Sequence, residues 1–227
     1  MKFLDQNKAG KYLLYAIGEI LLVVLGILIA LQINSWDQRN KNREREAFIL
    51  KELHSEFLKN KEQFNRCMQV HQNAYEGCQE IVDQFPIDID IVNLDSLSAN
   101  LQKIFRAFTF NPSNGTINSL INTSSFELIS NQELRQLLIS WEDVVEDYRE
   151  EEIYAQEFLR GVFNPYTFDY FDYDFDWSNP KNKMEQLETL KFQNYIRERL
   201  TDLEQIIENP EKEAQIVESS INRILEL

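Results

Sequence analysis

The longest apolar run of the chain covers residues 12–33 and reads YLLYAIGEILLVVLGILIALQI. It contains one charged residue, Glu19. As a helix, a run of this length covers the roughly 30 Å hydrocarbon core of a bilayer. The pattern therefore predicts a transmembrane helix over residues 12–34, which follows a polar N-terminal tail of residues 1–11.

A secretory signal peptide is the main alternative to an uncleaved span. Its apolar core is shorter, about 7–15 residues, and ends at a small-x-small cleavage site. Here the run continues into the sequence QINSW, which contains no such site. Trp36 beyond the run and Tyr12 and Tyr15 at its start resemble the aromatic belts of membrane interfaces. We therefore expect an uncleaved single span.

One face of the predicted span carries Tyr15, Glu19, Gly26 and Ala30, at about 100° per residue. Gly26 and Ala30 form a small-xxx-small pair, which allows two helices to approach closely. A buried acid costs about 3 kcal/mol, and roughly a dozen apolar residues outweigh it. We expect this face to form a helix–helix interface in a homo-oligomer, with Glu19 hydrogen-bonding across it. Two alternatives stay open: a lone anchor whose acid reaches the membrane surface, and Glu19 carboxylates that line an ion path.

Residues 35–85 predict a long juxtamembrane helix with one apolar seam. Its positions step by three and four, as in a coiled coil or bundle: Leu50, Leu53, Phe57, Asn60, Phe64, Cys67, His71, Ala74, Cys78, Ile81 and Phe85. Gly77 is a weak interruption, and Pro86 ends the pattern. We expect this helix to continue unbroken from the span.

Residues 86–227 predict the remainder of a soluble helical domain. Residues 86–94 alternate apolar and acidic side chains, which indicates a short strand or an extended linker. Asp95 is expected to cap a helix that continues to Ala107, and Thr116 to cap a short helix that ends at Asn122.

The sequence SNQE at residues 130–133 predicts a capping box at the start of a long helix. Its apolar face is formed by Leu134, Leu137, Leu138, Trp141, Val145, Tyr148, Ala155, Phe158 and Val162. We expect the helix to end at Gly161 or at Asn164-Pro165. The other face is expected to be solvated and acidic, with Glu142, Asp143, Glu146, Asp147, Glu150, Glu151, Glu152 and Glu157.

Residues 163–180 are rich in aromatic and acidic residues and have no helical period, so we expect a non-helical insertion that could face a protein partner. The C-terminal helix is expected over residues 181–226, with a break at Asn209-Pro210. The predicted fold class is all-α: a single N-terminal transmembrane helix, then a soluble helical bundle with long heptad-like helices.

Candidate chemistry is sparse. Cys67 and His71 are four residues apart, so both could reach one metal ion, but Cys78 is too distant on the same helix to join them. Core packing explains all three residues, and an inter-chain contact in a parallel oligomer is the alternative. Residues 172–183 lack the Gly and Glu of a calcium-binding EF-hand loop at their sixth and twelfth positions. We therefore expect no catalytic residues, no metal and no cofactor.

Composition excludes further classes of protein. The formal net charge is -15 and the pI about 4.6, which argues against nucleic-acid binding, because phosphate contacts need a basic face. Two cysteines are too few for a disulfide scaffold. The 15 Phe, 9 Tyr and 3 Trp are enough to build a core.

Two blocks, KYLLYAIGEILLVVLGILIALQINSW and NPSNGTINSLINTSSFELISNQELRQLL, resemble a family of uncharacterised single-span membrane proteins of Bacteroidota-type bacteria. The resemblance covers the whole chain. It implies a bacterial inner-membrane setting and supplies no activity.

Basic residues are nearly balanced on the two sides of the span, with Lys2, Lys8 and Lys11 before it and Arg39, Lys41, Arg43 and Arg45 after it. The short tail before an uncleaved span favours a periplasmic C-terminal domain. We expect a non-enzymatic, membrane-anchored scaffold, sensor or accessory protein that self-associates. The alternative is an oligomeric ion-conducting or proton-responsive assembly.

Overall fold

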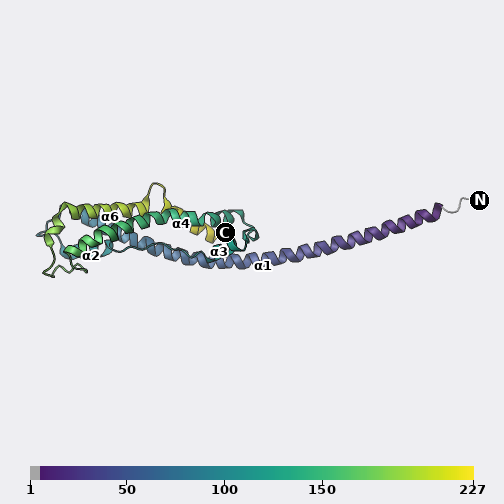
Figure 1. Ribbon diagram of the computed structural model, residues 1–227, viewed down its shortest axis with the longest axis horizontal. Coiled ribbons are helices and arrows are strands. Elements are labelled where there is room, and N and C mark those ends of the chain that lie inside the picture. The colour runs from purple at the N-terminus through teal and green to yellow at the C-terminus, as the bar shows by residue number, and fades with distance from the viewer. Residues whose placement is uncertain (1–5) are drawn as a thin grey trace, which may run out of the picture. The chain divides into compact units, whose positions relative to one another are not determined.

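The computed structural model describes residues 6–227, with side chains from Tyr12 onward (Figure 1). Every regular element within this range is helical, which confirms the all-α prediction. The chain divides into two compact units, Met1–Lys51 and Glu52–Leu227. The predicted tail of residues 1–11 lies largely outside the described side chains.

The first helix, α1, covers Gln6–Val82 and belongs to both units. The prediction of one unbroken helix is thereby confirmed. It stops at Val82 rather than at Phe85, because Pro86 disfavours the helical conformation for the residue before it and the last residues form turns.

The N-terminal part of α1 presents apolar side chains to its surroundings. Within residues 6–227, α1 is the one helix long and apolar enough to cross a membrane, judged by length and composition. Its most apolar window of 18 residues has a mean hydropathy of 2.6, and none of that window is buried.

The second unit contains seven helices, α1 included, with shorter turns between them (Figure 1). The helices after α1 are α2 (Leu94–Ile104), α3 (Gly115–Asn122), α4 (Gln132–Phe158), α5 (Asn164–Tyr170), α6 (Leu190–Glu208) and α7 (Glu213–Glu226). Two 3-10 turns, Phe126–Leu128 and Met184–Glu188, and one π-turn, Leu159–Phe163, complete the unit.

Two helix caps differ from the predictions. Asn93 caps α2 by accepting from the backbone N–H of Ser96, so the assignment of the cap to Asp95 was wrong. Asn131 caps α4 by accepting from the N–H of Leu134, so the cap is not Ser130 of the predicted box. Asn accepts such bonds as well as Ser or Asp does.

The segment before α2 and the start of α3 also need correction. Residues 86–93 form bends and turns, so the linker alternative holds and the strand does not. Helix α3 begins at Gly115, and its cap position is Asn114, two residues before the predicted cap Thr116; Asn114 makes no side-chain cap bond.

Neither Gly161 nor Asn164-Pro165 ends the long helix. Gly161 lies inside the π-turn, and Asn164 is the first residue of α5, so the insertion is helical as far as Tyr170. A π-turn adds one residue per turn and moves the inward-facing positions by one. Val162 is consequently 41% exposed, and Phe163 is buried in its place.

The C-terminal helix starts later than predicted and breaks where predicted. Helix α6 begins at Leu190, where the Thr189 hydroxyl accepts from the N–H of Phe192. It ends at Glu208, before Asn209-Pro210, and α7 resumes at Glu213.

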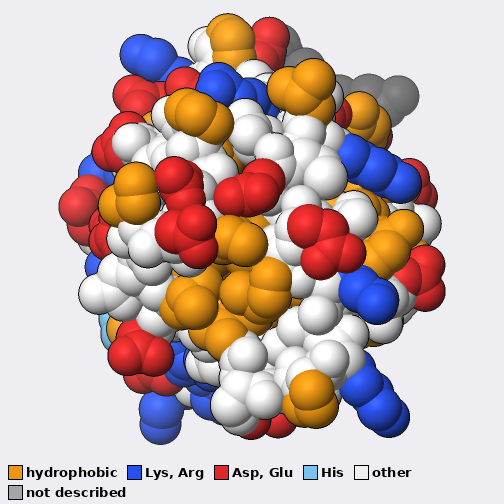
Figure 2. Space-filling model, turned by 90° about the vertical axis from the view of Figure 1, so that its left-hand side faces the viewer, with side chains coloured by type: hydrophobic (Ala, Val, Ile, Leu, Met, Phe, Trp, Pro, Cys, Tyr) orange, Lys and Arg blue, Asp and Glu red, His pale blue; other side chains and the backbone are white. Residues whose placement is uncertain are grey.

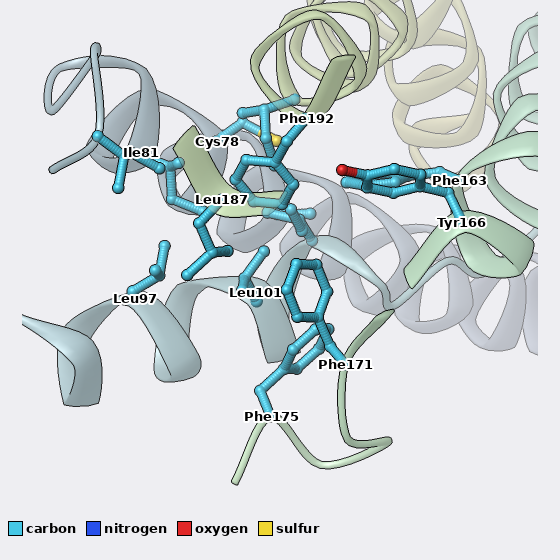
Figure 3. Packing of buried hydrophobic residues seen from close by; sticks show 14 of the residues in the cluster. Cys78, Ile81, Leu97, Leu101, Phe163, Tyr166, Phe171, Phe175, Leu187 and Phe192 are labelled. Carbon is cyan, nitrogen blue, oxygen red and sulfur yellow. The ribbon is translucent and has the colours of Figure 1, made fainter. Parts of the chain in front are cut away.

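The core joins the α1 seam to the other helices of the second unit. Figure 3 shows Cys78 and Ile81 of α1 facing Leu187 and Phe192, with Leu97 and Leu101 of α2 beside them. Phe171 and Phe175 come from the loop after α5. Each fully buried Leu, Ile or Phe contributes about 1.5–3 kcal/mol, so this cluster is a main source of the domain's stability.

Candidate functional site

The residues of the predicted helix–helix interface lie on the exposed part of α1. Tyr15 is 79% exposed, and Glu19 and Ala30 are also exposed. A Cβ atom built at Gly26 would meet no other atom within 4 Å. The surface around Gly26 is therefore open for the close approach of another helix.

Cys67, His71 and Cys78 lie on the α1 seam and are 3%, 1% and 0% exposed. Burial, with the negative charge of Glu152 as the next cause, raises the pKa of the Cys67 thiol to about 11. Burial raises the pKa of Cys78 to about 12. Both thiols stay protonated near neutral pH and are poor nucleophiles. This is the placement of core residues, and another chain could reach these side chains only if the domain opened.

His71 bonds to a carboxylate in the core. Its Nε2 lies 3.0 Å from Oε1 of Glu152, and the two side chains are 2% and 0% exposed. The tautomer with hydrogen on Nε2 donates to Glu152 and leaves Nδ1 as a lone pair. The other oxygen, Oε2, accepts from the backbone N–H of Phe110 at 2.7 Å. One carboxylate thus joins α1, α4 and the segment that follows α2.

Residues 105–114, here called the connecting segment, link α2 to α3 without helix or strand. Buried backbone in such a segment needs partners from elsewhere. Asn60 on α1 supplies two: its Oδ1 accepts from the N–H of Ser113 at 2.8 Å, and its Nδ2 donates to the Ser113 carbonyl at 2.9 Å. An amide thus substitutes for one rung of a β-ladder.

A buried cation holds the start of the connecting segment. Arg199 on α6 is 0% exposed. Its Nε donates to the Ile104 carbonyl at 3.2 Å and its Nη2 to the Arg106 carbonyl at 3.3 Å. Burial lowers the pKa of Arg199, and the negative charge of Asp202, three residues along α6, is among the causes that partly offset this.

Further side-chain bonds hold the rest of the connecting segment and the start of α3. Trp141 Nε1 donates to Oδ1 of Asn114 at 2.9 Å. Oε2 of Glu56 accepts from both the backbone N–H and the hydroxyl of Thr116. We call Asn60, His71, Glu152 and Arg199, with the connecting segment they hold, the buried polar clamp.

The hydrogen bonds of the clamp join separate elements of the second unit. His71 and Glu152 do not line the cavity between α2, α5 and the loop after α5. No group of three or more His, Cys, Asp or Glu residues within the described range has a metal-binding arrangement. The clamp fixes the position of α1 relative to α4 and of the connecting segment between them.

The acidic loop after α5 is held by its own hydrogen bonds. Asp172 Oδ1 accepts from the backbone N–H of Asp174 at 3.0 Å, and its Oδ2 accepts from the Asn179 amide at 2.9 Å. These bonds lower the pKa of Asp172. Its carboxylate therefore organises the loop, as Asp side chains do in Asx-turns.

Glu152 is the site residue that the sequence pattern did not identify, since it was assigned to a solvated acidic face. That assignment is wrong because Glu152 is 1% exposed. The signal was in the spacing. Glu152 lies four residues after Tyr148 and three before Ala155, so it falls on the apolar face that these two residues share. A polar residue on a buried face needs a hydrogen-bond partner.

Comparisons with known proteins add a family. No curated protein and no solved structure matches the chain. A family model matches residues 19–167, more than half of the chain, from within the apolar part of α1 into α5. The matched range includes the connecting segment, Asn60, His71 and Glu152. The chain therefore belongs to DUF6090, a family of unknown function.

Proposed function

We propose that the chain is a non-enzymatic, membrane-anchored scaffold, sensor or accessory protein that self-associates through its first helix. The observation that carries the proposal is the division of α1. Its large apolar side chains between Tyr12 and Trp36 are all exposed, whereas from Leu53 the same helix is part of the core. Exposed apolar surface of this extent needs a lipid or protein environment.

The face with Tyr15, Glu19, Gly26 and Ala30 is the proposed contact between copies. Small residues let two helix backbones approach, and a polar side chain on the same face can hydrogen-bond across the contact. In a single span surrounded by lipid, an acid on the face with the small residues would be destabilising. A contact between two helices would give this acid a hydrogen-bond partner.

We propose a bacterial inner membrane with the C-terminal domain on the periplasmic side. The likeness to single-span proteins of Bacteroidota-type bacteria supports the inner-membrane setting. Labelling tests it. Ser219 is exposed on α7, so the Ser219→Cys variant should react with a membrane-impermeant maleimide in intact cells. The wild-type chain, whose two native cysteines are buried, is the silent control. Labelling of the variant only after lysis would reverse the assignment.

The end of the domain where α1 stops is the proposed surface for a protein partner. Figure 2 shows hydrophobic side chains gathered near the centre of this end, with acidic side chains around them. Ile91 and Leu190 lie in segments joined by the hydrogen bond from the Ile89 N–H to Glu188 Oε1, and Tyr173 lies in the loop after α5. These three side chains are 81%, 75% and 77% exposed. A photo-crosslinking residue at position 91 should capture a protein in cells, whereas one at exposed Ile139 on α4 should not.

The oligomeric state of the full chain, measured by light scattering in mild detergent, tests self-association. Gly26→Ile and Ala30→Ile should shift the oligomer toward monomer, because they fill the contact. Gly18 has the same open surroundings in the chain and lies about 100° around the helix from Glu19. Gly18→Ile is therefore the matched control and should leave the oligomer intact.

Glu19→Gln separates the two membrane hypotheses. Gln still hydrogen-bonds across helices, so the proposed oligomer should persist. Liposomes that contain the wild-type chain should pass no ions. A conductance that Glu19→Gln alters would replace the scaffold proposal with the ion-conducting assembly, and a wild-type chain that stays monomeric at all concentrations would contradict both.

A further inference from the structure

A cavity of about 310 Å³ opens between the end of α2, helix α5 and the loop after α5. This volume lies at the lower end of the roughly 300–1,000 Å³ of ligand pockets. Two hydrogen bonds hold the loop against α2: Ser98 Oγ donates to the Phe175 carbonyl at 3.1 Å, and Gln102 Nε2 donates to the Asp174 carbonyl at 2.9 Å. The cavity is thus bounded on one side by an anchored loop.

Two pairs of aromatic rings form the walls. Phe105 of the connecting segment lies 5.4 Å from Phe175, and Phe168 of α5 lies 5.8 Å from Tyr173, centroid to centroid, with each pair inclined by 31°. Phe175 is buried although its φ is 56°, a conformation that bulky residues rarely adopt. Phe168 and Tyr173 are 57% and 77% exposed. Walls of this kind favour a flat apolar ring.

One polar group on the wall lacks a partner. Asn164 directly follows the π-turn, and its Oδ1 is buried with no hydrogen-bond partner among the described residues. An unsatisfied buried acceptor is destabilising. Rotation about χ2, which is broad for Asn, exchanges Oδ1 and Nδ2 at the cavity wall. Only one of these two atoms can face the cavity at a time, so the amide can offer either a donor or, after the rotation, an acceptor to a molecule there.

Charge at the cavity does not select an ion. Arg106 and Asp174 both line the cavity, so its lining carries one positive and one negative side chain and no net charge. The remaining selectivity comes from the rings and from neutral polar side chains on the lining, which are Asn164, Gln102, Thr167 and the Tyr173 hydroxyl. We propose that this cavity binds a small neutral aromatic molecule that carries a carboxamide or lactam group, with its ring between the aromatic walls and its amide paired with Asn164. This goes beyond anchoring and does not depend on self-association.

A titration of 4-fluorobenzamide into the full chain in lipid nanodiscs, followed by fluorine NMR, tests the inference. Empty nanodiscs supply the baseline for partition into lipid. We expect a dissociation constant of about 1 mM, typical of one small fragment in one site. 4-Fluorobenzoate lacks the amide donor and 4-fluorotoluene lacks the amide, so each should bind at least about fivefold more weakly.

Two variants and a control assign the binding to the cavity. Asn164→Leu keeps the side-chain size and removes the amide, and should weaken 4-fluorobenzamide about tenfold. Phe168→Ala changes an exposed residue, so the fold should persist, and it should weaken binding similarly. Tyr154→Ala removes an aromatic residue that is 62% exposed outside the cavity and should change nothing. Equal binding of all three probes, no effect of Asn164→Leu and Phe168→Ala, or no binding above empty nanodiscs would overturn the inference.

Discussion

Single polar residues at apolar seam positions determine how this domain closes. Asn60 and His71 on α1 and Glu152 on α4 are buried where a bundle places Leu or Val, and each is hydrogen-bonded to a residue far away in the sequence. A buried pair of this kind adds little net stability over an apolar pair, because desolvation opposes it. Any other register of the helices would leave these polar groups buried without hydrogen-bond partners, which is destabilising. We therefore infer that these residues set the register of α1 against α4.

Glu152→Leu should lower the free energy of unfolding by about 3–5 kcal/mol, because it leaves His71 and the Phe110 N–H buried without a partner. Glu152→Gln retains one acceptor and should cost about 1–2 kcal/mol. Urea unfolding of the detergent-solubilised chain measures both.

The control is Glu150→Leu on the exposed side of the same helix turn. It should change the free energy of unfolding by less than about 0.5 kcal/mol. If Glu150→Leu and Glu152→Leu have equal effects, the buried pair does not set the stability of the domain.

Asp202 makes the stability depend on pH. Burial raises its pKa to about 6, with Arg199 opposing and Glu198 and Glu151 adding to the rise. The pKa of Asp in an unfolded chain is about 3.9. Below pH 3.9, Asp202 is protonated in both the folded and the unfolded chain, and the stabilisation that comes from its raised pKa is fully present. It is lost as the pH rises through 6, at most about 3 kcal/mol in all, and solvent screening reduces this value.

Unfolding of the wild-type chain and of Asp202→Asn at pH 4.5, 5.5 and 7 measures this contribution. From pH 4.5 to pH 7, the unfolding free energy of the wild type should fall relative to that of Asp202→Asn. A constant difference would place the titration of Asp202 at its unfolded value.

At the scale of elements, the π-turn of Leu159–Phe163 reassigns the inward positions between α4 and α5. Phe163→Ala should cost about 3–5 kcal/mol, as for a buried Phe, whereas Val162→Ala should cost less than about 0.5 kcal/mol. An uninterrupted α-helix would put Val162 on the buried face, so the reverse order in thermal or urea unfolding would show that the turn is absent.

The element scale also shows what sequence patterns can and cannot predict. The three-and-four step located the buried face of α1 and of α4 because burial follows helix geometry directly. It failed beyond Phe158 because no residue type signals a π-turn. It misassigned the caps because Asn93 and Asn131 compete with neighbouring Asp95 and Ser130 for the same role, and the choice is made by the path of the preceding chain.

At the scale of the whole molecule, the all-α class and the break at Asn209-Pro210 could be predicted from apolar spacing and from Pro. The buried polar clamp could not, because its bonds join positions 42 to 95 residues apart. Periodicity describes one helix at a time and gives no information about which helices face each other. Asn60 and His71 were visible as polar residues on a seam, but their partners became identifiable only in the folded chain.

The clamp also has a consequence for biosynthesis. His71 is made 81 residues before Glu152, which at about 5–20 residues per second is a wait of about 4–16 s. Until then the seam of α1 has neither its polar partner nor the apolar faces of α4 and α6. An amphipathic helix therefore stays without its buried partners while these 81 residues are made, and any factor that meets the emerging chain meets that apolar face.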